Sequence, residues 1–102
     1  MSLVHDIRSK NAGPFWITID LFCSNAEAFR HLKSALTTEQ VAQTLRTPTH
    51  ALQRFDIDDL NVIKFSAPRE MIQGSRTDRD MHGASYAVLV KELVAELENA
   101  AP

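Results

Sequence analysis

The stretch FWITIDLF at 15–22 constrains the fold of this chain more than any other. Its odd-numbered residues are all apolar, whereas its even-numbered residues place Thr18 and Asp20 between two aromatic side chains. Strict alternation over a run of this length is typical of a β-strand that buries one face. Such a strand needs neighbouring strands and a covering layer. The other face is predicted to be half buried around its two polar residues.

The rest of the chain supplies the partners that this strand needs. Strands are predicted at 3–9, 50–57 and 60–67, and helices at 24–36, 37–46 and 83–100. Ser24 is the predicted N-cap of the first helix, and Thr37 or Thr38 that of the second. In the last helix, apolar residues recur at the spacing of one helical face.

The order of these elements predicts the fold class. With 102 residues the chain fits one domain, 1–102. Strands in pairs with helices between them favour an α+β fold of order β-β-α-α-β-β-α. We expect ferredoxin-like packing, with a mainly antiparallel sheet of about four strands and the helices on one face.

Charge and hydrophobicity exclude several functional classes. The net charge of -2 and the absence of a basic block argue against nucleic-acid binding. No apolar run approaches the roughly 20 residues of a membrane helix, and the start has no signal-length apolar segment. Cys23 is the only cysteine, which favours a reducing compartment. A cytoplasmic protein that binds neither nucleic acid nor membrane is predicted, with Cys23 as a buried thiol or, alternatively, an activated thiolate.

The first candidate site is RSKNAGP at 8–14. Arg8 and Lys10 are cations near a predicted strand end, and Asn11 and the amides near Gly13 add neutral donors. Cations beside exposed N–H groups suit a carboxylate or phosphate. The structural alternative is a tight hairpin in which Asn11 and Gly13 only satisfy turn geometry.

Thr18 and Asp20 are the second candidate. A half-buried aspartate needs a partner, because an unpaired buried charge is costly. Arg8 on the neighbouring strand is the predicted partner. Asp20 then acts as a base or orients Lys10, with Thr18 as a further ligand contact. The alternative is an exposed strand face without a function.

The third candidate is the polar loop predicted at 69–82. A structureless segment of this length inside a compact domain is uncommon and often functional. Arg69, Gln73 and Ser75 carry side chains that can hold a polar ligand. This segment is therefore predicted to bind a ligand or to form an interface.

At the end of this loop, Asp78, Asp80 and His82 stand two residues apart. His82 is predicted to act as an acid or base that an adjacent carboxylate orients. A metal site is not predicted, because the spacing is no recognised cage and no cysteine or second histidine is close. The structural alternative makes Asp80 the N-cap of the last helix, with Asp78 favoured by the helix dipole.

Three motifs resemble those of a family of short bacterial and fungal proteins of unknown function: RSKNAGPFWITIDLF, SAPR and QGSRTDRDMHGA. That family is described as ferredoxin-like, and its members occur beside, or fused to, proteins like the acyclic terpene utilisation protein AtuA. The matching positions are Arg8, Lys10, Asn11, Gly13, Pro14, Phe15, Thr18, Asp20, Arg69, Gln73, Gly74, Asp78, Asp80, Met81, His82 and Gly83. Where the pattern continues with a further histidine, this chain has ASYAVL.

The resemblance implies an accessory subunit that works with an AtuA-like partner on branched carboxylic acids or their coenzyme A thioesters. Two alternatives remain open. One is a self-contained hydratase, lyase or isomerase with Asp20 or His82 as its base and an anion held by basic residues. The other is a homo-oligomeric ligand-binding module. No cofactor is identified, and the stretches 8–14 and 78–83 are predicted to meet.

Overall fold

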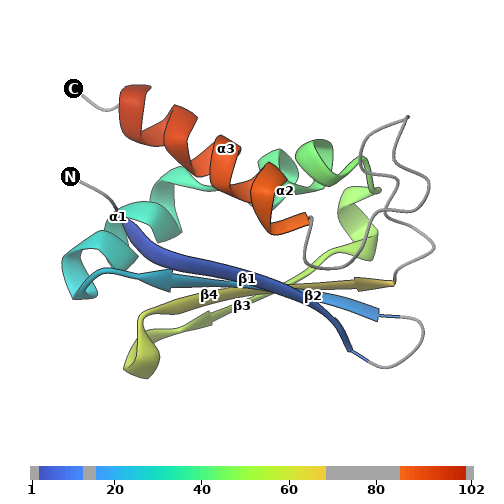
Figure 1. Cartoon of the computed structure of the whole chain (residues 1–102), viewed down its shortest axis with the longest axis horizontal. Coiled ribbons are helices and arrows are strands. Elements are labelled where there is room, and N and C mark those ends of the chain that lie inside the picture. The colour runs from blue at the N-terminus through green and yellow to red at the C-terminus, as the bar shows by residue number, and fades with distance from the viewer. Residues whose placement is uncertain (1–2, 13–15, 69–85, 101–102) are drawn as a thin grey trace.

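The computed structural model describes residues 3–12, 16–68 and 86–100 of the chain (Figure 1). In chain order the elements are β1 (Val4–Ala12), β2 (Trp16–Cys23), α1 (Ala26–Ala35), α2 (Thr38–Leu45), the 3-10 turn η1 (Thr49–Ala51), β3 (Gln53–Ile57), the 3-10 turn η2 (Asp58–Leu60), β4 (Val62–Pro68) and α3 (Tyr86–Ala100). The predicted order β-β-α-α-β-β-α is confirmed.

The strands form one antiparallel sheet in the order β1-β2-β4-β3. Because β4 lies between β2 and β3, the unit from β2 through the helices to β3 is a split β-α-β motif. If β1 followed α3 in the chain, the order would read β-α-β-β-α-β, with α1 and α2 as one helical segment. The fold is thus the ferredoxin-like arrangement with one edge strand moved to the N-terminus, which confirms the predicted class.

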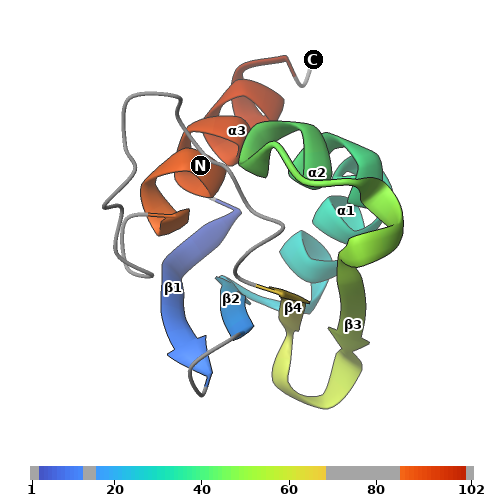
Figure 2. The ribbon, with the colours of Figure 1, turned by 90° about the vertical axis from the view of Figure 1, so that its right-hand side faces the viewer.

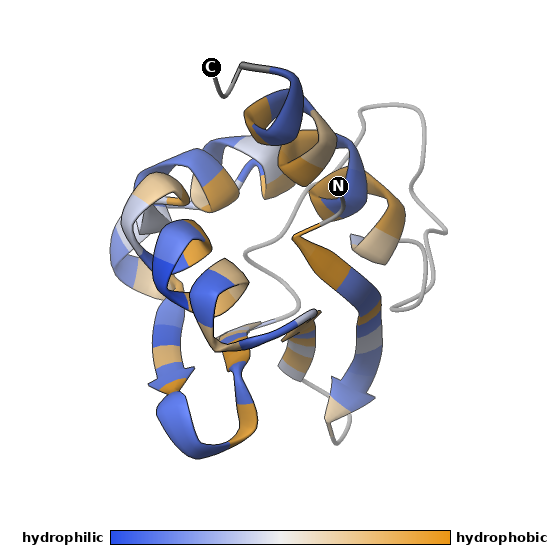
Figure 3. Ribbon diagram, turned by 90° about the vertical axis from the view of Figure 1, so that its left-hand side faces the viewer, coloured by the Kyte–Doolittle hydropathy of each residue, from blue (hydrophilic) through white to orange (hydrophobic). Residues whose placement is uncertain are grey.

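The core lies between this sheet and the three helices, which pack on one of its faces (Figures 1 and 2). From β2 and β4, the side chains of Ile17, Ile19, Leu21, Ile63 and Phe65 are almost fully buried. The alternation that predicted the strands shows as orange and blue bands along them (Figure 3). Among the described helices, none is both long and apolar enough to cross a membrane.

Several element boundaries differ from the prediction. β1 runs to Ala12, so Lys10 and Asn11 lie within a strand and not in a turn, because the ladder with β2 continues to the pair Ala12 and Trp16. β3 begins only at Gln53, after η1. β4 runs from Val62 and ends at Pro68, one residue beyond the predicted range 60–67.

Helix capping follows the prediction for α2 but not for α1. The Thr37 hydroxyl accepts a hydrogen bond from the Gln40 N–H at 3.1 Å, and the Gln40 side chain accepts one from the Thr37 N–H at 2.9 Å. The expected cap Ser24 is wrong: Asn25 caps α1 and accepts from the Ala28 N–H at 2.7 Å. The Ser24 N–H instead donates to the backbone of the chain start.

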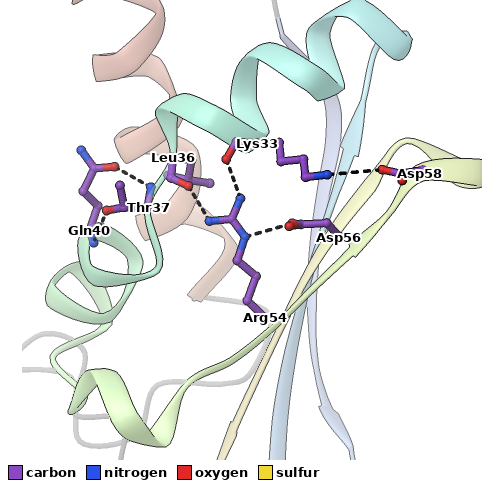
Figure 4. A network of polar contacts seen from close by, with 7 residues as sticks. All are labelled: Lys33, Leu36, Thr37, Gln40, Arg54, Asp56 and Asp58. Atoms are coloured by element: carbon purple, nitrogen blue, oxygen red, sulfur yellow. Dashed lines mark hydrogen bonds and ion pairs between the residues drawn. The ribbon is translucent and has the colours of Figure 1, made fainter.

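One arginine ties the edge strand β3 to the helical layer (Figure 4). Arg54 donates from Nη1 to the Leu36 carbonyl at 2.6 Å and from Nη2 to the Lys33 carbonyl at 3.0 Å. Its Nε pairs with Asp56 at 2.9 Å. Since these carbonyls belong to the C-terminal end of α1, the guanidinium supplies donors that the helix itself cannot.

Candidate functional site

The face of the sheet opposite the helices is not covered by any described element, and we call it the open face (Figure 1). Residues directly opposite each other on neighbouring strands share a face, so the register identifies its members. They are Asp6, Arg8, Lys10 and Ala12 of β1, Trp16, Thr18, Asp20 and Phe22 of β2, Val62, Lys64, Ser66 and Pro68 of β4, and Gln53, Phe55 and Ile57 of β3.

Two cross-strand rows bring predicted site residues together on the open face. One row runs Arg8, Asp20, Lys64 and Phe55, and the next runs Lys10, Thr18, Ser66 and Gln53. Sequence reasoning grouped the first two residues of each row. It missed Lys64 and Ser66. These residues lie on β4, which pairs with β2 although α1, α2 and β3 lie between the two strands in the chain, and the sequence does not show that pairing. The alternation in 60–67 was the one available signal.

Asn11 does not join this group. It is paired with Ile17, so it lies on the opposite face of the sheet from Arg8 and Lys10, where it is exposed to solvent. Because β1 stays extended there, Asn11 and Lys10 point to opposite faces, and the role of Asn11 as a ligand contact stays a prediction.

Arg8 also has a different partner from the predicted one. Its Nε binds the Asp6 carboxylate at 2.8 Å, and its guanidinium lies 5.6 Å from the centre of the Phe22 ring. The hydrogen bond from Arg8 holds the pKa of Asp6 below its ordinary value of 3.8. Asp20 is the cross-strand neighbour of Arg8, but no ion pair between them occurs.

Thr18 and Asp20 instead carry buried oxygen atoms without partners. Thr18 is only 7% exposed, and its Oγ1 has no hydrogen-bond partner in the described part of the chain. The same holds for Oδ1 of Asp20. Such groups are uncommon in native proteins, and each costs about 1–3 kcal/mol relative to a satisfied one. The centre of the open face therefore contains two buried side-chain oxygens whose hydrogen bonds are not satisfied.

The predicted loop residues Arg69, Gln73, Ser75, Asp78, Asp80 and His82 lie outside the described residues. Their predicted roles, and the predicted contact between 8–14 and 78–83, remain predictions. Within 3–12, 16–68 and 86–100, no cluster of three or more histidine, cysteine, aspartate or glutamate residues is placed to hold a metal ion.

Cys23 is a buried thiol at the end of β2. Burial raises its pKa from the ordinary value of 9.0 to about 11, because the apolar surroundings disfavour the thiolate. The thiol therefore stays protonated near neutral pH. Of the two interpretations of this residue, the structure favours the packed thiol over the activated nucleophile.

A second surface feature is a groove of about 350 Å³ between the edge strand β1 and α3, which we call the β1–α3 groove. Its lining is Val4, His5, Asp6, Ile7, Ala87, Val88, Lys91, Val94, Ala95 and Glu98. Val88 is 57% exposed. Sequence reasoning missed this groove, although an apolar Val88 off the inner stripe of the last helix was the available signal.

Comparison with known proteins identifies a family for most of the chain. The family model described as a domain of unknown function (DUF4387) matches residues 1–93. That match includes all of the sheet and the start of α3. No curated protein and no solved structure matches the chain significantly.

Proposed function

The chain belongs to the DUF4387 family of unknown function, and we propose that it is an accessory subunit that docks on a larger AtuA-like protein. The shared role is the breakdown of branched carboxylic acids or their coenzyme A thioesters. The resemblance of its motifs supports the choice of partner. The observation that carries the docking is the β1–α3 groove at the edge of the sheet, whose lining combines apolar side chains with charged ones.

The lining of the groove indicates what it binds. Ile7 and Val94 contribute apolar surface from β1 and α3, and Val88 adds an exposed apolar side chain at the wall. Lys91 and Glu98 also line it with opposite charges, and the Glu98 carboxylate accepts a hydrogen bond from the Leu3 N–H at 2.9 Å. A mixture of apolar and charged side chains around one groove is the composition of a protein–protein contact. The groove suits an apolar anchor side chain with polar residues of both signs beside it.

The edge strand makes one docking mode less favourable. The ladder of β1 and β2 is irregular between Val4 and Asp6, and an irregular edge pairs poorly with an added strand. We therefore expect the partner to insert side chains, as a helix does in a groove. Burying one large aliphatic side chain there contributes about 1.5–3 kcal/mol, which is the scale of an interface hot spot.

Two substitutions that each replace an exposed apolar side chain with glutamate test this docking. Val88→Glu places a charge in the groove, whereas Leu60→Glu places the same charge at an exposed apolar side chain in η2. With the AtuA-like protein of the same organism as bait, we expect wild type and Leu60→Glu to co-purify and Val88→Glu to be lost. Equal capture of both variants would refute docking at the groove.

Absence of any complex with the AtuA-like protein would refute the accessory role itself. The role also predicts that the isolated chain does not turn over branched acids or their thioesters. Turnover by the chain alone, abolished in Asp20→Asn or His82→Gln, would establish the alternative of a self-contained hydratase, lyase or isomerase.

A further inference from the structure

The open face carries exposed aromatic side chains of the kind that protein interfaces bury. Four large apolar side chains are exposed in the described residues, and two of them, Trp16 and Phe55, lie on this face. The buried oxygens without partners, on Thr18 and Asp20, lie at its centre. A four-stranded antiparallel sheet with one covered face often pairs through the other, as in β-sandwiches.

We propose that two copies of this chain pair through their open faces, about a two-fold axis that lies between the sheets and parallel to the strands. This symmetry reverses the order of strands across the interface, so β2 faces β4 of the second copy and β1 faces β3. Residues in the same cross-strand row then face each other. The proposal does not depend on the accessory role and uses a different surface.

At the centre, this symmetry places polar residues opposite polar residues and opposite charges opposite each other. Thr18 faces Ser66 of the second copy, whose hydroxyl can donate or accept. Asp20 faces Lys64 of the second copy. Because Asp20 and Lys64 are also cross-strand neighbours in one chain, the four side chains form a square of alternating charge. Each interaction occurs twice, as a two-fold interface requires.

Away from the centre, several facing pairs are also compatible, although Asp6 faces Ile57 of the second copy. Trp16 meets Pro68 of the second copy, and Phe22 meets Val62, so apolar side chains face apolar side chains. Phe55 meets Arg8 of the second copy, a ring and a guanidinium that attract each other. Sheets in aligned packing are rotated by about 30°, so the match is closest for the central rows.

The other two-fold axis in the plane of the sheet is unfavourable. An axis perpendicular to the strands stacks β1 on β1 and β2 on β2. Depending on where this axis crosses the strands, Lys10 faces Arg8 of the second copy, or Arg8 and Asp20 each face the same residue of the second copy. Facing like charges are destabilising in a desolvated interface. The strand-parallel axis is the one that the charge pattern favours.

The size of the open face sets the expected affinity. It offers fewer residues than the roughly 20–30 per side of a standard interface. We therefore expect a reversible dimer with a dissociation constant on the order of 10 μM. This dimer leaves α3 exposed to solvent, and the β1–α3 groove shares only Asp6 with the open face, so the two surfaces can be occupied together.

Wild-type protein provides the first test, because Trp16 is the only tryptophan in the chain. Sedimentation from about 1 to 500 μM spans the expected transition. We expect dimers to form over this range, and acrylamide quenching of Trp16 to fall along the same curve. A monomer throughout, or a dimer that leaves Trp16 equally quenched, would overturn the proposal. So would protection of Trp16 only by the AtuA-like protein.

A charge exchange provides the second test. Asp20→Lys and Lys64→Asp each place four like charges at the centre of their own dimer. Mixing the two variants faces lysine with aspartate in both central pairs. We expect each folded variant alone to stay monomeric at a protein concentration 100 times the wild-type dissociation constant. We expect the mixture to form heterodimers.

The control is Glu39→Lys, the same charge change on α2, which should dimerise like wild type. Circular dichroism establishes that each variant is folded. Failure of the folded variants to associate on mixing would contradict the proposed axis. If either variant does not fold, the wild-type quenching experiment decides the matter alone. Val88→Glu should dimerise normally, which separates this surface from the groove.

Discussion

Replacing Arg54 with alanine should be among the most destabilising changes outside the apolar core. Its guanidinium donates to two backbone carbonyls at the end of α1 and to Asp56, and its side chain is only 15% exposed. It also lies 5.7 Å from the centre of the Phe65 ring. Hydrogen bonds to a charged group contribute about 1.5–3 kcal/mol each when buried. Partial exposure reduces their sum, so we expect a loss of about 3 kcal/mol.

A matched control exists in the same sheet. Arg8 also pairs with an aspartate two residues away, at 2.8 Å, but its side chain is 73% exposed. An exposed pair of this kind contributes little, so Arg8→Ala should leave the unfolding midpoint nearly unchanged. Arg54→Lys should fall between the two, because an ammonium cannot reproduce the planar fork that reaches two carbonyls and a carboxylate.

Urea unfolding followed by far-ultraviolet circular dichroism measures these differences, at concentrations where the copies are separate. For a domain of this size, about 3 kcal/mol also lowers the melting temperature by roughly 10–20 °C. Equal destabilisation by Arg54→Ala and Arg8→Ala would show that burial does not distinguish the two pairs. Arg54 would then not be the residue that holds β3 against α1.

The remaining predictions concern single side chains. Thr37→Ala removes the capping box of α2 and should cost about 1 kcal/mol of unfolding free energy. Asn61 has a φ of 55°, so Asn61→Ala should cost about 1 kcal/mol whereas Asn61→Gly should not, by the same urea assay. Because burial raises the pKa of Cys23 to about 11, wild type should lose stability relative to Cys23→Ala as the pH rises from about 9 toward 11. Folded protein should also resist iodoacetamide at neutral pH. The pKa of Asp6 is lowered, so its contribution is present above its ordinary pKa and should be lost as the pH falls below it, which comparison with Asp6→Asn measures by pH-dependent unfolding.

The sequence predicted the elements well because their periodicity is local. Alternation in 15–22 identified a strand with one apolar face, and it also placed Thr18 and Asp20 together on the other face. The choice of Ser24 over Asn25 as a cap failed, since both residue types can cap and the backbone geometry of the turn decides between them.

Sheet register could not be read from the chain, because it depends on which strands become neighbours. β4 enters the sheet between β2 and β3, which brings Lys64 next to Asp20. The partner of Arg8 was misjudged for a related reason. Asp6 is two residues away on the same face of the same strand, and its carboxylate reaches the guanidinium. The prediction considered only the neighbouring strand.

The most direct test of the accessory role is hydrogen–deuterium exchange of the chain, alone and with the AtuA-like protein. Docking at the groove predicts that the partner slows exchange in β1 and α3, the elements that line the groove, and leaves α1 and α2 unchanged. Slowed exchange confined to α1 and α2, or no change anywhere at saturating partner, would contradict it.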